Sequence, residues 1–80
     1  MGMSDATADR IRELCKLSGI TPNRLSILSG VSQSTVKSIL NGESKNPGVV
    51  TLKKLCDGLN ISIADFFNTD RFKELEQEIQ

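Results

Sequence analysis

The stretch TPNRLSILSGVSQSTVKSILNG, residues 21–42, has the spacing of two short helices joined by a tight turn. Two helices that cross steeply come closest near the middle of the first, where Ser26 supplies the small residue required. Gly30 is expected to end this helix, because the chain reverses there in a left-handed conformation that disfavours a Cβ atom. Val36 and Ile39 turn one side of the second helix toward a core. The stretch therefore predicts a helix-turn-helix unit.

The segment before this unit has the periodicity of an amphipathic helix. Its apolar positions recur at i, i+3 and i+4, in Ile11, Leu14 and Cys15. The helix is expected to end at Gly19. Its expected N-cap is one of three residues, Ser4, Asp5 or Thr7.

Local signals also give the limits of the two helices in the helix-turn-helix unit. Thr21 is expected to cap the first, because Pro22 follows at a position where a missing N–H costs nothing. Its buried face is expected to consist of Leu25 and Leu28. Ser32 is expected to cap the second helix, which ends at residues 41–42, an Asn-Gly pair.

Two further helices are expected beyond a polar loop that contains Pro47. The fourth helix has apolar residues at helical spacing, namely Val49, Leu52, Leu55, Cys56 and Leu59, and Asn60 can close it. Ser62 and Asp65 form a capping pattern for a short fifth helix, in which Ile63, Phe66 and Phe67 bury apolar area. The predicted fold class is therefore all-α, a five-helix bundle, with no strand pattern.

The last eleven residues carry a sparse apolar stripe on a charged segment. Its members are Phe72, Leu75 and Ile79. Such a segment forms only a marginal helix that must dock to persist. We therefore expect one domain in residues 1–69 and an amphipathic C-terminal tail in residues 70–80, which either contributes to a homodimer or folds back on its own bundle.

The composition argues against several classes of function. The 80-residue chain has no histidine, and its two cysteines, Cys15 and Cys56, fall on apolar helix faces without a CxxC pattern. We expect both thiols to be buried and reduced, with a disulfide as the alternative. No metal, cofactor or catalytic residue is predicted, because no acid, base and nucleophile are paired. No signal peptide or long apolar run is present, so a cytoplasmic protein without membrane contact is expected.

The formal net charge is zero, but the charges are unevenly distributed. Residues 21–54 carry five basic residues against one acidic residue, whereas residues 55–80 carry an acidic excess. The positive excess coincides with the helix-turn-helix unit and is consistent with a polyanionic partner. The alternative is an ordinary solvated surface.

The span of residues 11–67 resembles the phage-repressor and Cro type of helix-turn-helix domain, the XRE-like, lambda repressor-like family. The agreement lies in these residues: Leu25, Gly30, Val31, Ser32, Val36, Ile39, Asn41, Gly42, Pro47, Thr51, Leu52, Leu59, Ile61 and Ser62. The resemblance implies that the third helix lies in the major groove of double-stranded DNA and that a dimer spans two half-sites. In lambdoid repressors, residues at the positions of Gln33 and Ser34 read base edges.

Three positions depart from the family pattern. Many members have an arginine where Cys15 stands and a glutamate where Leu40 stands, forming a partly buried ion pair. An apolar pair is a coherent joint replacement, since one buried charge without the other would be costly. Pro22 stands where the family commonly has a glutamine that contacts phosphate, so that contact is not expected here.

The outward side of the third helix supplies candidate DNA contacts. The candidates for base reading are Gln33, Ser34, Thr35, Lys37 and Ser38. Gln33 can pair bidentately with adenine, and Lys37 can donate to guanine. The candidates for phosphate contact are Thr21, Asn23, Arg24, Ser32, Asn41, Lys45 and Asn46, with Asn41 taken from the resemblance.

The predicted function is that of a sequence-specific DNA-binding transcriptional regulator, which binds a pseudo-palindromic operator as a homodimer. The alternative is a repressor-like protein-interaction module, or an antitoxin-type protein that binds a protein partner through its tail and binds DNA weakly. An enzyme is not expected.

Overall fold

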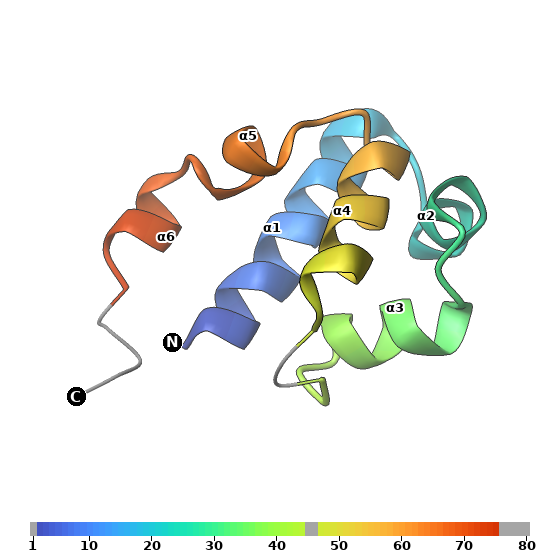
Figure 1. The fold of residues 1–80 in the computed structure, drawn as a ribbon, viewed down its shortest axis with the longest axis horizontal. Coiled ribbons are helices and arrows are strands. Elements are labelled where there is room, and N and C mark those ends of the chain that lie inside the picture. Colours follow the sequence, from blue (N-terminus) through green and yellow to red (C-terminus); the bar gives the residue numbers. More distant parts are fainter. Residues whose placement is uncertain (1, 45–46, 76–80) are drawn as a thin grey trace.

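The structure is a computed structural model that describes residues 2–44 and 47–75. Within these ranges the chain forms six helices and no strand, which confirms the all-α prediction. In chain order they are α1 (Met3–Ser18), α2 (Pro22–Ser29), α3 (Gln33–Leu40), α4 (Val49–Gly58), α5 (Ile63–Phe67) and α6 (Asp70–Lys73). In Figure 1, α2 and α3 lie together on one side of α1 and α4, and α5 and α6 lie on the other. Within the described residues, no helix has the length and apolar character needed to cross a membrane.

The predicted caps of α2, α3 and α5 are confirmed. In each case the hydroxyl oxygen of the capping residue accepts a hydrogen bond from the backbone N–H three positions later. The N···O distances are 3.1 Å for Thr21, 3.2 Å for Ser32 and 3.0 Å for Ser62. Asn60 follows α4 in the left-handed region, with a φ of 57°. Asparagine tolerates this conformation better than most residues with a Cβ atom, so the chain can reverse toward α5.

The predicted N-cap of α1 is wrong. The helix begins at Met3, with Gly2 as its N-cap residue, which is earlier than all three candidate caps. The hydroxyl of Thr7 instead donates to the carbonyl oxygen of Met3 inside the helix, at 2.8 Å. Ala6, Thr7 and Ala8 are all buried, so packing of these small residues against the bundle extends the helix toward the N-terminus.

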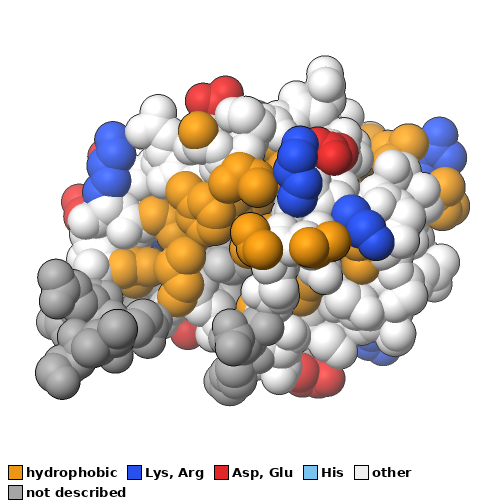
Figure 2. Space-filling view, in the orientation of Figure 1, with side chains coloured by type: hydrophobic (Ala, Val, Ile, Leu, Met, Phe, Trp, Pro, Cys, Tyr) orange, Lys and Arg blue, Asp and Glu red, His pale blue; other side chains and the backbone are white. Residues whose placement is uncertain are grey.

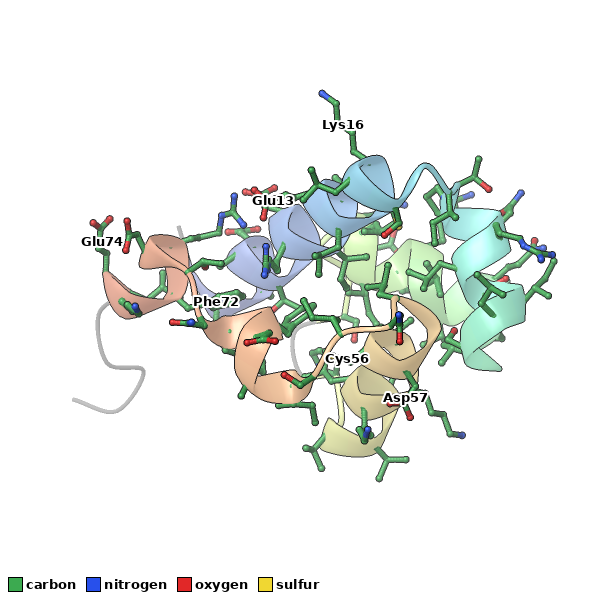
Figure 3. The ribbon with its side chains drawn as sticks, turned by 90° about the horizontal axis from the view of Figure 1, so that it is seen from above. Glu13, Lys16, Cys56, Asp57, Phe72 and Glu74 are labelled. Carbon is green, nitrogen blue, oxygen red and sulfur yellow. The ribbon has the colours of Figure 1, made fainter. Side chains whose placement is uncertain are left out.

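A single cluster of buried side chains lies between the helices. Its members are Ile11, Leu14, Cys15, Leu25, Val31, Val36, Ile39, Leu40, Leu55, Cys56, Leu59 and Phe66. Figure 3 places Cys56 inside the bundle. Both cysteines are free and buried, as predicted, and desolvation by burial raises the pKa of each thiol above its ordinary value.

Two residues expected in this core are exposed. Leu28 is 46% exposed because α2 faces the bundle through Leu25, Ser26 and the half-buried Ser29 rather than through Leu28. Val49 is 70% exposed at the first position of α4; Thr51 and Leu52 are half-buried, and the first buried residues of this helix are Leu55 and Cys56. Periodicity gave the apolar positions of both helices correctly, but the packing of neighbouring helices determines which turns are covered.

The close packing of α2 against α4 depends on a glycine. A Cβ atom added at Gly58 would lie 3.0 Å from the Cβ atom of Ser29 and 3.0 Å from its backbone nitrogen. The two helices can therefore approach this closely only because position 58 lacks a side chain. The position of α2, and of the turn that joins it to α3, thus depends on this contact.

The start of the C-terminal tail folds back on its own bundle. Phe72 packs against the core, with ring centroids 4.8 Å from Phe67 and 6.0 Å from Phe66 (Figure 3). The Nη1 atom of Arg71 lies 3.8 Å from a carboxylate oxygen of Glu13 on α1. Of the two alternatives for the tail, a homodimer contact or packing on its own bundle, Phe72 therefore shows the second. Ile79, the last member of the predicted stripe, lies outside the described residues.

Candidate nucleic-acid interface

The orientation of α3 is fixed by its buried side. Val36 and Ile39 are each 2% exposed, and Leu40 is also buried in the core cluster. Because these three residues are held by packing, the opposite side of the helix must face outward. The predicted base-reading residues lie on this outward side: Gln33, Ser34, Thr35 and Lys37 are exposed and Ser38 is half-buried.

A groove with a volume of about 590 Å³ runs along one flank of α3. It is formed by residues of α1, α2 and α3 together with the C-cap of α3: Arg12, Pro22, Asn23, Gln33, Ser34, Val36, Lys37, Leu40 and Asn41. Its polar side chains are guanidinium, ammonium, amide and hydroxyl groups, all of which can donate hydrogen bonds, and no described carboxylate lines it. This flank is therefore suited to an anionic or hydrogen-bonding ligand.

The opposite flank of α3 differs in charge. A second hollow, of about 440 Å³, is lined by Ser34, Thr35, Ser38, Glu43 and Ser44. Glu43 supplies a carboxylate, and none of the described residues that line this hollow is basic. Ser34 borders both hollows and so lies on the ridge between them. On the face drawn in Figure 2, apolar side chains gather mainly over α4, α5 and α6, whereas the surface over α3 is largely polar.

Gln33 and Lys37 are available for contacts. Both side chains are exposed, and neither takes part in a hydrogen bond or ion pair within residues 2–44 and 47–75. Ser32 and Thr35, in contrast, bond to each other, with 2.9 Å between their hydroxyl oxygens. Gln33 and Lys37 can thus meet a ligand without first breaking an internal bond, so they are the stronger candidates for base reading.

Three predicted phosphate-contacting residues lie at the start of α2. Thr21, Asn23 and Arg24 are all exposed there, and Asn23 also lines the groove. The hydroxyl oxygen of Thr21 accepts the backbone N–H of Arg24 and retains its own proton for donation. Pro22 brings no backbone N–H and no polar side chain to this helix start, so the surrounding residues must supply the donors.

The remaining predicted phosphate contacts lie at the ends of α3 or beyond. Ser32 is exposed at the N-cap, and Asn41 is exposed at the C-cap, where it lines the groove. Lys45 and Asn46 lie outside the described residues. The structure therefore brings Asn23, Gln33, Lys37 and Asn41 together in one groove, with Thr21, Arg24 and Ser32 on the surface nearby.

Ion pairs reduce the positive excess inferred from the sequence. Lys53 Nζ lies 2.6 Å from Asp57 Oδ1, and this hydrogen bond and charge raise the pKa of Lys53. Within the described part of the chain, by contrast, no carboxylate lies within 4.0 Å of the charged groups of Arg12, Arg24 or Lys37. Among the described residues of 21–54, the cations without an ion pair are thus Arg24, Lys37 and Lys54, and of these only Lys37 lines the groove.

Arg12 is a candidate residue that the sequence reasoning did not identify. It is exposed on α1, yet its Nη2 atom donates to the carbonyl oxygen of Leu40 at the end of α3, at 2.8 Å. It also lines the groove. The sequence could have indicated this, because Arg12 stands one turn before Cys15 on the same helix. Both side chains therefore point toward α3. Cys15 and Leu40 themselves lie in one core cluster, where α1 packs on α3.

Comparison with known proteins finds related sequences and structures. The family described as Cro/C1-type HTH DNA-binding domain matches residues 10–71. An uncharacterized HTH-type transcriptional regulator of Bacillus subtilis (strain 168), RghRB, is 36% identical over 52 residues, which are 65% of this chain and 37% of that protein.

Two solved structures are similar in both fold and sequence. The crystal structure of prophage Lp1 protein 11 has a TM-score of 0.82 and 34% identity, with 94% of this chain and all of that chain covered. An HTH_3 family transcriptional regulator from Vibrio cholerae has a TM-score of 0.77 and 32% identity, with 85% of this chain and 38% of that chain covered. The chain thus spans little more than a third of the Bacillus and Vibrio proteins.

Proposed function

Because the chain belongs to the family of Cro/C1-type helix-turn-helix DNA-binding domains, we propose that it is a sequence-specific transcriptional regulator. We propose that it reads duplex DNA with α3 in the major groove. The observation that carries the proposal is the two-sided character of α3. One side is held in the core, and the other presents exposed hydrogen-bonding side chains that include Gln33 and Lys37. The names of the Bacillus and Vibrio relatives, both transcriptional regulators, support this function.

Base reading falls mainly to two residues of α3. The side-chain amide of Gln33 can bind adenine through two hydrogen bonds: its nitrogen donates to N7 and its oxygen accepts from N6. Lys37 can donate to O6 or N7 of guanine. They stand four residues apart, so they lie on one side of the helix and can reach neighbouring base pairs. Ser34, Thr35 and Ser38 carry short hydroxyls that can bond to bases or to phosphate.

Contacts to phosphate set the register of α3 on the duplex. The exposed helix starts at Thr21 and Ser32 are suited to this, because free N–H groups and the helix dipole favour an anion. Asn23, Arg24 and Asn41 add side-chain donors, and Lys45 and Asn46 are proposed to extend the contact beyond α3. These contacts are independent of sequence and hold the reading side chains in place.

We further propose that the protein binds as a homodimer. The eight residues of α3 span only ~12 Å, which is about three to four base pairs of duplex. So short a site gives little specificity in a genome. Two copies related by a two-fold axis, with their α3 helices about 34 Å apart, would read a pseudo-palindromic operator.

Selection of bound duplexes from a random DNA pool tests the proposed function. We expect a selected pseudo-palindrome whose half-sites contain bases that Gln33 and Lys37 can contact. The logarithm of the binding constant for the selected site should fall linearly with the logarithm of salt concentration, because phosphate contacts release counterions. A pool that yields no consensus after repeated rounds would contradict sequence-specific binding.

A second candidate function is binding of a protein partner, as in a repressor-like interaction module or antitoxin. It is favoured by the zero net charge and by exposed apolar residues that include Ile27, Val49 and Val50. Salt distinguishes the two functions. Binding dominated by apolar contacts changes little between low and high salt, whereas DNA binding weakens steeply.

A further inference from the structure

Arg12 links α1 to the end of the reading helix. Its Nη2 atom donates to the carbonyl oxygen of Leu40, the last residue of α3, at 2.8 Å. The last carbonyls of a helix lack partners within the helix and carry partial negative charge, so a guanidinium is favourable there. This bond holds the charged group at a defined place on the wall of the groove.

The guanidinium retains unused donors in that position. It has five N–H groups, and among the described residues it makes only the bond to Leu40 and no ion pair. Arg10, two residues earlier on α1, differs. Its guanidinium is committed to the carboxylate of Glu13 and to the carbonyl oxygens of Asp65 and Phe66.

The surroundings of Arg12 suit an anion. Lys37 lines the same groove, so two basic side chains border a space that has no carboxylate among the described residues of its lining. At the α2 end of the groove, Pro22 offers no donor, which leaves Asn23 as the polar lining residue of α2. Among the described residues, the hollow on the other flank of α3 has the carboxylate of Glu43 in its lining and no basic side chain.

We propose that Arg12 binds a backbone phosphate of the DNA strand that passes along the groove flank of α3. The bond to Leu40 orients the guanidinium, and its remaining N–H groups donate to the phosphate oxygens. The contact comes from α1, outside the helix-turn-helix unit, and it determines on which side of α3 the nearer strand runs. This inference rests on the proposed function and adds a residue to the same interface.

The test compares three variants of the full chain on the selected duplex and on a scrambled duplex of equal length. Arg12→Gln removes the charge, Arg12→Lys keeps it, and Lys16→Gln is the matched control. Lys16 is exposed on the same helix, does not line the groove and extends away from the bundle in Figure 3. Thermal melting of each variant reports on folding.

Arg12→Gln should weaken binding to both duplexes about tenfold, the usual size for one charge-assisted hydrogen bond, and should reduce the salt slope by about 0.9. Lys16→Gln should change the slope much less. Arg12→Lys should keep the slope but bind several-fold more weakly, because one ammonium cannot hold the carbonyl and the phosphate in the guanidinium geometry.

Three results would overturn the inference: an unchanged slope in Arg12→Gln, an equal loss of slope in Lys16→Gln, or wild-type affinity in Arg12→Lys. If Arg12→Gln does not fold, the comparison of Arg12→Lys with the wild type decides the question. Failure of the wild-type protein to bind either duplex would instead contradict the proposed function, and the inference with it.

Discussion

Gln33 and Lys37 are exposed on α3, and their side chains have no internal partner among the described residues, which makes them the most direct test of the interface. Replacing either with alanine should weaken binding to the selected operator by about 1–3 kcal/mol, because a base contact is lost, while the free energy of unfolding stays nearly constant. Titration and thermal melting of the same samples measure both quantities. The matched control is Lys54→Ala, since Lys54 is an exposed lysine of α4. If both α3 variants bind as tightly as the control, the reading face has been assigned wrongly.

Cys15 and Leu40, both in the core cluster, stand where the resemblance implies a partly buried ion pair in many members of the family. Leu40→Glu alone should destabilise the protein by about 3–5 kcal/mol, because it buries a charge without a partner. Adding Cys15→Arg should recover much of this loss. A double-mutant cycle by urea unfolding gives the coupling energy, and additive effects would contradict a direct contact.

Arg12 could supply a partner to the carboxylate introduced at position 40, since it already reaches the backbone there. The cycle should therefore be repeated with Arg12→Gln present. Coupling between positions 15 and 40 that survives this change belongs to those two residues alone.

At the scale of a helix, the glycines at the two ends of α4, the N-cap Gly48 and the last residue Gly58, have opposite constraints. Gly58→Ala should destabilise the protein by about 1–3 kcal/mol from overpacking against Ser29, which exceeds the gain of about 1 kcal/mol in helix propensity. Ser29→Ala should not rescue it, because the crowded atoms include the backbone nitrogen. Gly48→Ser should instead stabilise by roughly a few tenths of a kcal/mol, because α4 has no side-chain cap and that position is open. Thermal unfolding measures all three, and a stabilising Gly58→Ala would contradict the close approach of α2 and α4.

Helix limits were largely predictable from the sequence where a short-range signal sets them. The hydroxyl caps at Thr21, Ser32 and Ser62 depend on residues three positions away, so the sequence contains the whole interaction. Burial of a particular turn is different. Leu28 and Val49 have the right spacing but lie where no other helix covers them, and spacing along one helix carries no such information.

For the candidate nucleic-acid interface, too, the sequence predicted what depends on one helix and missed what depends on the packing of two. The outward side of α3 followed from its buried residues, but Arg12 acts on a helix 28 residues away in the chain, and only the packing of α1 on α3 reveals that. The roles of the base-reading and phosphate-contacting residues remain predictions, as does the boundary at residue 69.

At the scale of the whole molecule, we expect the tail to have two separable roles. Removing residues 70–80 should lower the free energy of unfolding, because Phe72 no longer covers Phe66 and Phe67. Removing only residues 76–80 keeps these contacts and should leave stability near that of the full chain. If the end of the tail contributes to the homodimer, this shorter deletion should sediment as a folded monomer and lose cooperative binding to the full operator. A deletion protein that stays dimeric would exclude residues 76–80 from the dimer contact.

The pH dependence of stability should reflect the two buried thiols. Their pKa values are raised in the folded state, so above the ordinary value of 9.0 the unfolded chain loses its thiol protons first. The stabilisation is fully present below that pH and is lost as pH rises toward the folded values, by at most about 1.4 kcal/mol per pH unit for each thiol. Urea unfolding at pH 7, 8, 9 and 9.5, all roughly below lysine titration, should show this decline. Cys15→Ala should make it shallower, and an identical slope in that variant would contradict the assignment.

Because both cysteines are buried, the rate at which their thiols are alkylated can report on local opening of the bundle. A thiol-alkylating reagent cannot reach Cys15 or Cys56 in the closed bundle, so each reacts only when its surroundings open. When closing is faster than alkylation, the labelling rate, compared with that of an unfolded peptide, gives the free energy of opening at that position. Cys15 reports on the separation of α1 from α3, and Cys56 reports on the release of α4. Mass spectrometry of the labelled protein with and without bound DNA would therefore map which part of the molecule becomes more rigid, without introducing any probe.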